Sequence, residues 1–273
     1  MRKIIASIAL LTLSTFVIIS CQKNKTEPAV STSDISVDVL AKIKNLGFST
    51  SGVVKDEDGY RVEGDIVLTN ELLNGSNTSS LLRIANTEQY RTTNLVTGLP
   101  RVIKIKVSNL GTAYVQGADL ANSRYNALGL RITFQRITSG TPNITIKGFN
   151  QGPSGGYITL GSSGFPTRQG NPYSTVKMNT NQYAYGSNPD VKYVGSVIQH
   201  ELGHCIGFRH TDYMDRSYSC GGSPVNEGAS NIGAILIPGT PSGPDANSWM
   251  LSCSNGGDRT FNSNDKVALN YLY

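Results

Sequence analysis

Several residue types are scarce in this 273-residue chain, and their scarcity narrows what it can be. Only 16% of its residues are charged whereas 38% are hydrophobic, which is unlike the composition of disordered proteins. The sequence has no internal repeat, and its 29 glycines and 11 prolines argue against a coiled coil or a helical repeat. Histidine and cysteine are rare, with three and four residues, so their positions carry most of the information. The chain therefore has the composition of one large, loop-rich domain with extensions.

A single long apolar run is present, and it lies at the N-terminus. Arg2 and Lys3 precede the run from Ile4 to Ile19, which has the pattern of an export signal that is later removed. The run has 16 residues, four of them Ser or Thr, which is short for a membrane span of roughly 20 residues. No later stretch is apolar enough to span a membrane.

The end of this run resembles a bacterial lipobox. Residues 18–21 read Ile-Ile-Ser-Cys, with a small residue before a cysteine that becomes the lipidated first residue of the mature chain. The resemblance implies a lipoprotein signal peptide over residues 1–20, lipidation at Cys21 and a polar tether over residues 21–33. We therefore expect an exported lipoprotein of the bacterial cell envelope, held to the membrane through Cys21. The alternative is an ordinary secretory signal with an incidental cysteine.

Charge is distributed unevenly along the rest of the chain. Residues 22–88 contain seven Lys and Arg against ten Asp and Glu, a net charge of −3. Residues 89–273 contain 15 Lys and Arg against nine Asp and Glu, a net charge of +6. Because the basic residues are not clustered, we expect no nucleic-acid partner. The acidic part is instead expected to pack onto the basic body.

The body shows the periodicity of strands followed by a helix. Ile103, Ile105 and Val107 alternate with lysines, which predicts a half-exposed strand over residues 101–107. Apolar residues spaced three and four apart then predict a helix from Tyr114 to Leu128. Four further strands are expected at residues 130–137, 144–149, 157–160 and 174–180. The pattern predicts an α+β fold with a mixed, mostly parallel sheet of about five strands and a backing helix.

The next predicted helix carries two histidines on one face. Ser187 or Asn188 can cap this helix, with Pro189 at its first position, and an apolar stripe faces the core. Its other side presents His200 and His204, which are four residues apart and therefore project in the same direction one turn apart. Two imidazoles in this arrangement can share a zinc ion.

The third histidine follows six residues later. Gly207 can adopt a positive φ, end the helix and turn the chain so that His210 approaches the same metal. The alternative is a surface helix with two solvated histidines, and it does not account for a pattern that uses every histidine of the chain. Three neutral histidines with one open position define a catalytic zinc site, so we expect His200, His204 and His210 to hold one Zn²⁺.

Residues 200–210, HELGHCIGFRH, resemble the metzincin signature HExxHxxGxxH and are closest to the bacterial dual-action HEIGH metallopeptidases. The resemblance implies a metzincin-like catalytic domain over residues 89–273 with a loop-rich lower part. It also implies a methionine turn at Ser248–Met250, with Met250 beneath the metal. A final helix over residues 262–273 fits the same pattern, with a cap at Ser263 or Asn264 and an apolar stripe formed by Val267, Ala268, Tyr271 and Leu272.

The ligand set predicts a zinc-dependent endopeptidase. Glu201, next to the first ligand, is expected to take a proton from the zinc-bound water and return it to the leaving amine. An extended peptide substrate is expected along an edge strand formed by residues 174–180, and the alternative is that these residues form an interior strand. Some metzincins supply a tyrosine two residues after the turn methionine; Ser252 stands there, and spacing does not support Tyr213 as its replacement. Any calcium sites stay open.

Two other functions are compatible with this sequence. One is a non-catalytic, zinc-containing binding lipoprotein, which would be expected to lose Glu201 or Gly207, and both residues are present. The other is a zinc hydrolase that acts on a non-peptide substrate.

The cysteines allow one disulfide. With Cys21 lipidated, three remain in an oxidising compartment. Cys205 belongs to the apolar stripe of the zinc helix, which predicts a buried free thiol. Cys220 and Cys253 are then expected to pair across the segment that contains Met250.

The acidic part contains a short motif of its own. Residues 62–66, Val-Glu-Gly-Asp-Ile, resemble the F-x-G-D-I segment of astacin-type pro-regions, with Val62 in place of phenylalanine. The resemblance implies that Asp65 binds the zinc and displaces the catalytic water, and that residues 34–88 are an acidic pro-segment of a latent zymogen. Cleavage near Arg83 or Arg91 would then release activity. Gly64 would let the backbone approach the site closely. The alternative is a surface turn with solvated acidic side chains.

Overall fold

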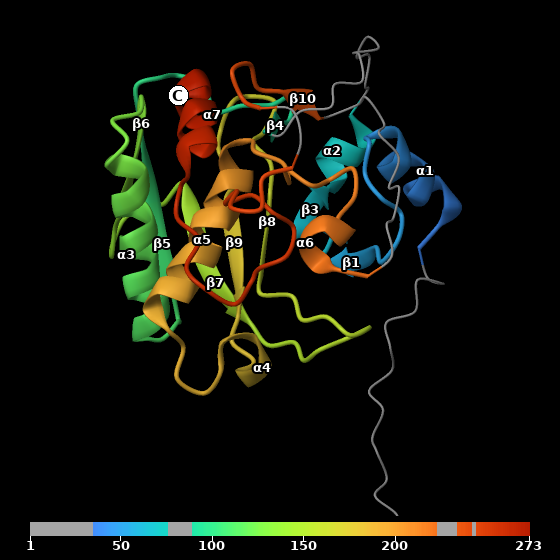
Figure 1. Ribbon diagram of the computed structural model, residues 1–273, viewed down its shortest axis with the longest axis horizontal. Coiled ribbons are helices and arrows are strands. Elements are labelled where there is room, and N and C mark those ends of the chain that lie inside the picture. The colour runs from blue at the N-terminus through green and yellow to red at the C-terminus, as the bar shows by residue number, and fades with distance from the viewer. Residues whose placement is uncertain (1–34, 76–88, 223–233, 242–243) are drawn as a thin grey trace, which may run out of the picture.

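The computed structural model describes residues 35–75, 89–222, 234–241 and 244–273, and Figure 1 shows how their helices and strands are arranged. The elements in chain order are α1 (Val37–Asn45), β1 (Val54–Asp56), β2 (Gly59–Val62), β3 (Ile66–Thr69), α2 (Asn70–Asn74), β4 (Tyr90–Arg91), β5 (Arg101–Ser108), α3 (Thr112–Asn126), β6 (Ile132–Arg136), β7 (Ile144–Phe149), β8 (Gly161–Gly164), β9 (Thr175–Asn179), α4 (Gln182–Tyr185), α5 (Val191–Ile206), α6 (Ser217–Cys220), β10 (Ile235–Leu236) and α7 (Ser263–Leu272). The elements α1 to α2 lie at the right of Figure 1, and α3 lies at the left. The fold is α+β, as the sequence predicts.

The main sheet is mixed and contains eight strands in the order β1-β2-β3-β8-β9-β7-β5-β6. Strands β6, β5, β7 and β9 run parallel to one another, and β8 pairs antiparallel with β9. On its other side β8 pairs parallel with β3, which begins an antiparallel meander with β2 and β1. The N-terminal segment (residues 35–75) therefore adds three strands to the five that residues 101–179 supply.

Four of the five strands expected from the sequence are present, as β5, β6, β7 and β9. The strand expected at residues 157–160 is wrong, because the strand there is β8, at residues 161–164. All four β8 residues are small and buried, so they show no apolar alternation. A Cβ on Gly161 would lie 2.7 Å from Glu201 Oε1, and one on Gly164 would lie 3.0 Å from the Tyr173 ring. Close neighbours, and not hydrophobic patterning, explain the residues of this strand.

The prediction that residues 174–180 form an edge strand is also wrong. Strand β9 lies between β7 and β8 and is hydrogen-bonded on both sides. The chain between β7 and β9 folds back, so that β8 lies on the far side of β9. The alternation of Val176 and Met178 does not predict this strand order. The strand beside the histidine cluster is therefore β8, and its outer edge is paired with β3.

Helices α3 and α5 pack closely against each other and against the sheet. Gly117 of α3 and Gly195 of α5 face one another at the crossing. A Cβ added to Gly117 would lie 3.0 Å from the backbone nitrogen of Gly195, so the close approach of these helices depends on both small residues. This crossing supports the helix that carries His200 and His204.

The start of α5 differs from the expected one. Asp190 is the N-cap, and its side chain accepts a hydrogen bond from the Tyr193 backbone nitrogen at 2.9 Å. Caps at Ser187 or Asn188 are therefore wrong. Pro189 precedes the cap and does not occupy the first helical turn.

The C-terminal helix α7 is tied to the preceding turn by a buried carboxylate. Asn262, and not Ser263 or Asn264, is the N-cap, and it forms a capping box with Asp265. The Asp265 side chain also accepts hydrogen bonds from Gln89 Nε2 at 2.7 Å, Ser248 Oγ at 3.2 Å and the Trp249 backbone nitrogen at 3.3 Å. The expected apolar stripe is partly wrong, because Val267 and Tyr271 are 42% and 54% exposed and Leu269 is buried with Ala268 and Leu272.

The N-terminal segment has an apolar cluster of its own. Its buried members are Ile35, Ile43, Leu46, Phe48, Val53, Val62, Ile66, Leu68 and Leu73, and Phe165 joins them from the segment after β8. Ion pairs also join this segment to the body: Asp56 lies 2.6 Å from Lys177, and Glu57 lies 2.9 Å from Lys147. The acidic part thus packs on the basic body through both apolar and charged contacts.

Within the described ranges, no helix combines the length and the hydropathy that a membrane span requires. The expected signal peptide, Cys21 and the tether lie outside the described residues.

Asp265 gives a prediction about pH and stability. Burial raises the pKa of Asp265 to about 7, whereas an unfolded aspartate titrates near 4. Because the folded state binds this proton more tightly, its stabilising contribution is complete below about pH 4 and is lost as the pH rises through about 7. We expect the melting temperature of the parent, relative to Asp265→Asn, to fall between pH 5 and pH 7.5. A difference that stays constant over this range would contradict the assignment.

Candidate metal centre

Helix α5 and the turn that follows it carry three histidines to one point. His200 and His204 lie one turn apart on α5, and Gly207 ends the helix with a left-handed φ of 111°. A Cβ on Gly207 would also lie 2.9 Å from the carbonyl oxygen of Asn94, so both backbone conformation and space require glycine here. The reversal at Gly207 brings His210 back toward the helix.

Four donor atoms from these histidines and Asp65 lie within 4.8 Å of one another. His204 Nε2 is 3.1 Å from His200 Nε2 and 3.2 Å from His210 Nε2. The carboxylate oxygen Asp65 Oδ2 is 3.2 Å from His210 Nε2 and 3.4 Å from His200 Nε2. Four ligands at about 2.0–2.1 Å from a tetrahedral zinc ion are separated by about 3.3–3.4 Å, so these atoms have the spacing of a zinc coordination sphere.

The second nitrogen of each ring faces a different part of the chain, and two of the three make a hydrogen bond there. His200 Nδ1 lies 2.8 Å from the Trp249 carbonyl oxygen, and His204 Nδ1 lies 2.8 Å from the Phe208 carbonyl oxygen. His210 Nδ1 faces Glu63 Oε2 at 3.5 Å. A proton on each Nδ1 leaves the Nε2 lone pair directed at the common point, which is the tautomer that a metal ligand needs.

The charges around this point favour a cation. Burial lowers the pKa of His204, whereas His210, where burial acts in the same direction, has its pKa raised to about 10 by the carboxylates of Asp65 and Glu63. These carboxylates thus attract positive charge to the cluster. A divalent cation held by three neutral rings supplies that charge, and nitrogen ligands with one carboxylate suit zinc. The residues therefore fit a zinc ion.

Glu201 is buried beside the cluster, with 1% of its surface exposed. Ser163 of β8 donates its hydroxyl to Glu201 Oε2 at 2.7 Å and lies 2.9 Å from the Glu201 carbonyl oxygen. Burial, and then the negative charge of Asp65, raise the pKa of Glu201 well above its ordinary value. A carboxyl group whose pKa is raised in this way is better suited to exchange a proton with a neighbouring group.

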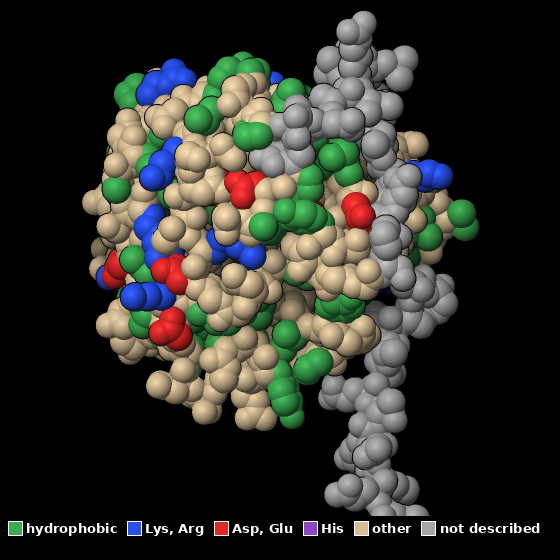
Figure 2. Space-filling model, viewed as in Figure 1, with side chains coloured by type: hydrophobic (Ala, Val, Ile, Leu, Met, Phe, Trp, Pro, Cys, Tyr) green, Lys and Arg blue, Asp and Glu red, His purple; other side chains and the backbone are tan. Residues whose placement is uncertain are grey.

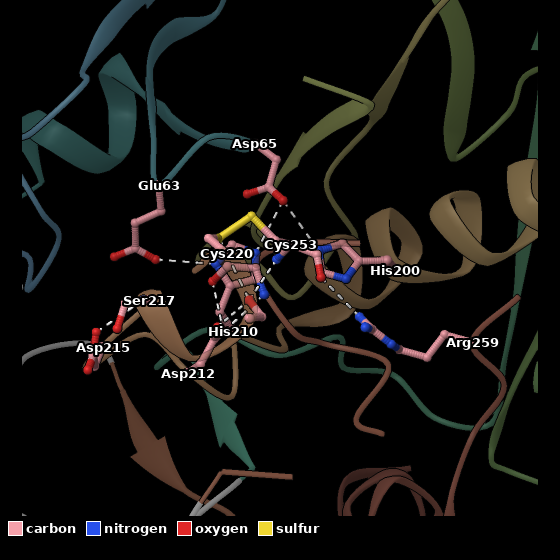
Figure 3. The surroundings of a disulfide bond; sticks show 12 residues. Glu63, Asp65, His200, His210, Asp212, Asp215, Ser217, Cys220, Cys253 and Arg259 are labelled. Carbon is pink, nitrogen blue, oxygen red and sulfur yellow. Dashed lines mark hydrogen bonds and ion pairs between the residues drawn. A yellow bond between two sulfur atoms is a disulfide. The ribbon is translucent and has the colours of Figure 1, made fainter. Parts of the chain in front are cut away.

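Asp65 reaches the cluster from the turn between β2 and β3. Its carbonyl oxygen accepts a hydrogen bond from the Ser163 backbone nitrogen at 3.0 Å, next to the β3–β8 pairing. Gly64 precedes it with a φ of 95°, and Glu63 has a φ of 52°. Figure 3 shows the side chains of Glu63 and Asp65 directed toward the histidines. Asp65 is therefore part of the cluster and not of a solvated surface turn.

The turn beneath the cluster contains Met250, which is fully buried. A Cβ on Gly203 of α5 would lie 2.7 Å from Met250 Sδ and 2.3 Å from the Trp249 ring, so glycine is required where the helix rests on this turn. The turn also supplies the Trp249 carbonyl oxygen that holds His200. Its role is thus to position a ligand.

A disulfide closes the loop beside the turn. Cys220 and Cys253 are bonded, with their Cα atoms 5.0 Å apart, and Figure 3 shows the bond close to His210. Cys205 is free and buried on α5. This is the arrangement that the apolar stripe of α5 predicts.

Ser252 and Tyr213, the two positions examined for a tyrosine that assists the metal, are not among the four donor residues. Ser252 Oγ donates to Asp212 Oδ1 at 2.8 Å. Tyr213 packs edge-on against Tyr90, with ring centroids 4.6 Å apart, and not among the four donor atoms.

Sequence reasoning missed three residues of this site: Glu63, Ser163 and Arg209. Glu63 lies inside the motif that contains Asp65, so the sequence could have indicated that its side chain also reaches the site. Ser163 and Arg209 carry no local signal, because their partners are distant in the chain.

Comparison with known proteins identifies a family. The model of the dual-action HEIGH metallopeptidases matches residues 60–273. The matched range includes Glu63 and Asp65 as well as the three histidines. No curated protein matches the chain.

Solved structures share limited similarity with this fold. A structure of myroilysin has a TM-score of 0.41 and 13% identity, and the match covers 66% of this chain and 96% of that chain. A second myroilysin structure has a TM-score of 0.39 and 16% identity, with 64% and 83% covered. High choriolytic enzyme 1, a hatching enzyme zinc-protease from the medaka fish Oryzias latipes, has a TM-score of 0.32 and 19% identity, with 58% and 74% covered.

The geometry predicts different outcomes for a ligand and for its neighbour. His204→Ala removes the ring that lies between the other two, so bound zinc is expected to fall from about one ion per chain to below about 0.2 after dialysis. Glu201→Gln keeps all three rings and is expected to retain about one zinc per chain. Metal analysis of both dialysed variants checks this. Full zinc occupancy in His204→Ala would show that the metal is held elsewhere.

Proposed function

Because the chain belongs to the dual-action HEIGH metallopeptidase family, we propose that it is a zinc-dependent endopeptidase made as a latent precursor. The observation that carries this proposal is the convergence of His200, His204 and His210 on one point with Glu201 buried beside them. In the proposed precursor, residues 34–88 are a pro-segment and residues 89–273 are the catalytic domain.

The three histidines would hold zinc, which would act as a Lewis acid and activate a water molecule for attack. Glu201 takes a proton from the attacking water at its carboxylate and delivers it to the nitrogen of the leaving amine. The hydroxyl of Ser163 orients that carboxylate through its 2.7 Å hydrogen bond. The carbonyl oxygens of Trp249 and Phe208 keep two of the rings in the orientation that the metal requires.

The peptide substrate binds along β8 in this proposal, which replaces the edge strand expected at residues 174–180. Strand β3 pairs with β8 through Ile66 and Val67, which is the mode in which an extended peptide adds to a sheet. Departure of the pro-segment leaves the outer edge of β8 free. A substrate then takes the place of β3 and runs antiparallel to β8.

Latency follows from two contacts of the pro-segment. Asp65 Oδ2 lies among the three histidine nitrogens, so it would occupy the position that the catalytic water needs. Strand β3 covers the substrate edge, and it runs parallel to β8, opposite to the direction proposed for a substrate. The reversed direction accounts for a segment that occupies the site without being cut.

Activation requires a cut between the pro-segment and the catalytic domain. Arg91 lies in β4, which pairs with β10, and the backbone nitrogen of Thr92 donates to the Gly207 carbonyl oxygen at 2.8 Å. A cut at Arg91 would disturb the turn that positions His210. We therefore favour a cut near Arg83, which lies outside the described residues.

The cellular setting is also a proposal. The lipobox-like residues 18–21 support export and a lipid anchor at Cys21, with a substrate protein met at the bacterial cell envelope.

Hydrolysis of unfolded casein tests the enzymatic function. The chain from Gln22, trimmed with trypsin and then freed of trypsin activity, is expected to cleave casein, and a zinc chelator should abolish cleavage. Glu201→Gln, trimmed in the same way, should lose at least about 10²-fold in rate while it keeps its zinc. Absence of cleavage by a zinc-loaded, trimmed parent would instead favour a non-catalytic binding lipoprotein.

The role of Asp65 gives a separate prediction. Asp65→Ala removes the fourth ligand, so the untrimmed variant is expected to hydrolyse a quenched peptide at least about tenfold faster than the untrimmed parent. Asp38→Ala is the matched control, because Asp38 lies in the same segment, is 73% exposed and pairs only with Lys42 among the described contacts. Equal activity of the untrimmed parent and Asp65→Ala would reject the latency proposal.

A further inference from the structure

The residue before the third histidine is a fully buried arginine. Arg209 has 0% of its surface exposed, and its Nη2 lies 3.0 Å from Glu63 Oε1. The guanidinium stacks 4.0 Å from the ring centroid of Phe48 and donates from Nη1 to the Gly47 carbonyl oxygen at 3.4 Å. Tyr213 lies on another side, with its ring centroid at 4.9 Å. A charge this deeply buried needs an anion as its partner, and Glu63 is that anion.

Most of these partners belong to the pro-segment. Gly47, Phe48 and Glu63 all precede Asp65, whereas Tyr213 and the Tyr90 carbonyl oxygen, which accepts from the Arg209 backbone nitrogen at 2.9 Å, belong to the catalytic domain. Loss of the pro-segment therefore removes the anion, the stacked ring and a carbonyl acceptor together. It leaves a guanidinium held by its backbone on one side and open on the other, directly beside His210.

A guanidinium in this state is suited to one class of ligand. Its planar donors match a carboxylate in two parallel hydrogen bonds, and the Tyr213 ring that remains beside it favours a charge-assisted pair over a solvated one. Arg216 adds positive charge nearby, because its field acts on the Glu63 carboxylate and its Nη1 would lie 4.0 Å from a Cβ on Gly64. The positive charges of Arg209 and Arg216 therefore favour an acidic side chain at the position of Glu63.

The path of the pro-segment shows where this position falls on a substrate. Glu63 is two residues before Asp65, and β3, which pairs with β8, follows Asp65. A substrate that runs antiparallel to β8 passes the positions of β3, then the metal, then Glu63. The acidic side chain would therefore belong to a residue on the C-terminal side of the cleaved bond.

We propose that Arg209 is the specificity-determining residue of the activated enzyme, that it binds an Asp or Glu side chain just C-terminal to the cleaved bond, and that Glu63 occupies this subsite in the precursor. The proposal rests on the proposed peptidase function and its latency. It deepens that function by naming the class of substrate.

The first experiment measures which residues the enzyme prefers around the cleaved bond, with no substrate sequence chosen in advance. A mixture of peptides from a denatured proteome is digested with the trypsin-trimmed chain, and the cleaved bonds are identified by mass spectrometry. Asp and Glu are expected to be enriched at the first or second position after the cleaved bond. Cleavage without any enrichment of acidic residues there would overturn the subsite while leaving the peptidase function intact.

The second experiment assigns the preference to Arg209. Two quenched peptides that differ only by Glu or Gln at the enriched position should differ at least about tenfold in kcat/KM with the parent. The double variant Glu63→Gln/Arg209→Gln keeps a neutral hydrogen-bonding pair in the precursor, so that the precursor still folds, and its ratio should fall to within about twofold. Arg136→Gln, at the Asp119 ion pair of α3 and β6, is the control and should keep the parent ratio. A preference for Glu that survives in the double variant would overturn the role of Arg209.

Binding provides a readout that does not depend on turnover. Trimmed Glu201→Gln is titrated with fluorescently labelled Glu and Gln peptides, and anisotropy should show at least about tenfold tighter binding of the Glu peptide. The difference should vanish when Arg209→Gln and Glu63→Gln are added. If no form cleaves peptides, the peptidase proposal fails, and this arm still decides whether Arg209 selects an acidic side chain: equal affinities for the two peptides would overturn it.

Discussion

Three imidazole rings, two of them fully buried, can direct one nitrogen each at a common point only if their rings are correctly oriented, and the rest of the architecture serves this requirement. The Phe208 carbonyl oxygen holds His204 through the reversal at Gly207. The Trp249 carbonyl oxygen holds His200, and Asp265 at the start of α7 accepts from the Trp249 backbone nitrogen. The third ring faces Glu63, from the N-terminal segment. Each ring is thus oriented by a different stretch of the chain, which explains why elements distant in sequence converge here.

Close packing around the site depends on residues that have little or no side chain. Gly203 rests on Met250 and Trp249, Gly161 rests on Glu201, and Gly117 meets Gly195 where α3 crosses α5. Larger residues at these positions would displace the helix that carries two of the ligands. On the face shown in Figure 2 no histidine surface is visible, in agreement with the burial of His204 and His210. The same packing that builds the cluster hides it from solvent in the proposed precursor.

The N-terminal segment contacts the candidate active site in three places. Strand β3 pairs with β8, Asp65 Oδ2 is the fourth donor atom beside the three histidine nitrogens, and Glu63 forms an ion pair with Arg209. In the proposed precursor, β3 takes the place of the substrate backbone and Asp65 takes the place of the attacking water. Glu63 takes the place of an acidic side chain of the substrate. An inhibitor that imitates a substrate in this way carries information about the substrate, because the same groups of the enzyme must recognise both.

The sequence by itself determined the features that depend on short spacing. Two histidines four residues apart must lie on one side of a helix, Gly207 can end that helix, and the alternation in β5 or the stripe of α3 follows from local periodicity. The tertiary structure alone decided where distant segments pair. The strand expected at residues 157–160 is β8, at residues 161–164, and β9 lies inside the sheet. Ser163 is hydrogen-bonded to Glu201, and Glu63 forms an ion pair with Arg209. The physical reason is that helix faces and turns are set by neighbours in the chain, whereas strand order and buried ion pairs are set by the packing of distant residues, such as Glu63 and Arg209, which are 146 positions apart.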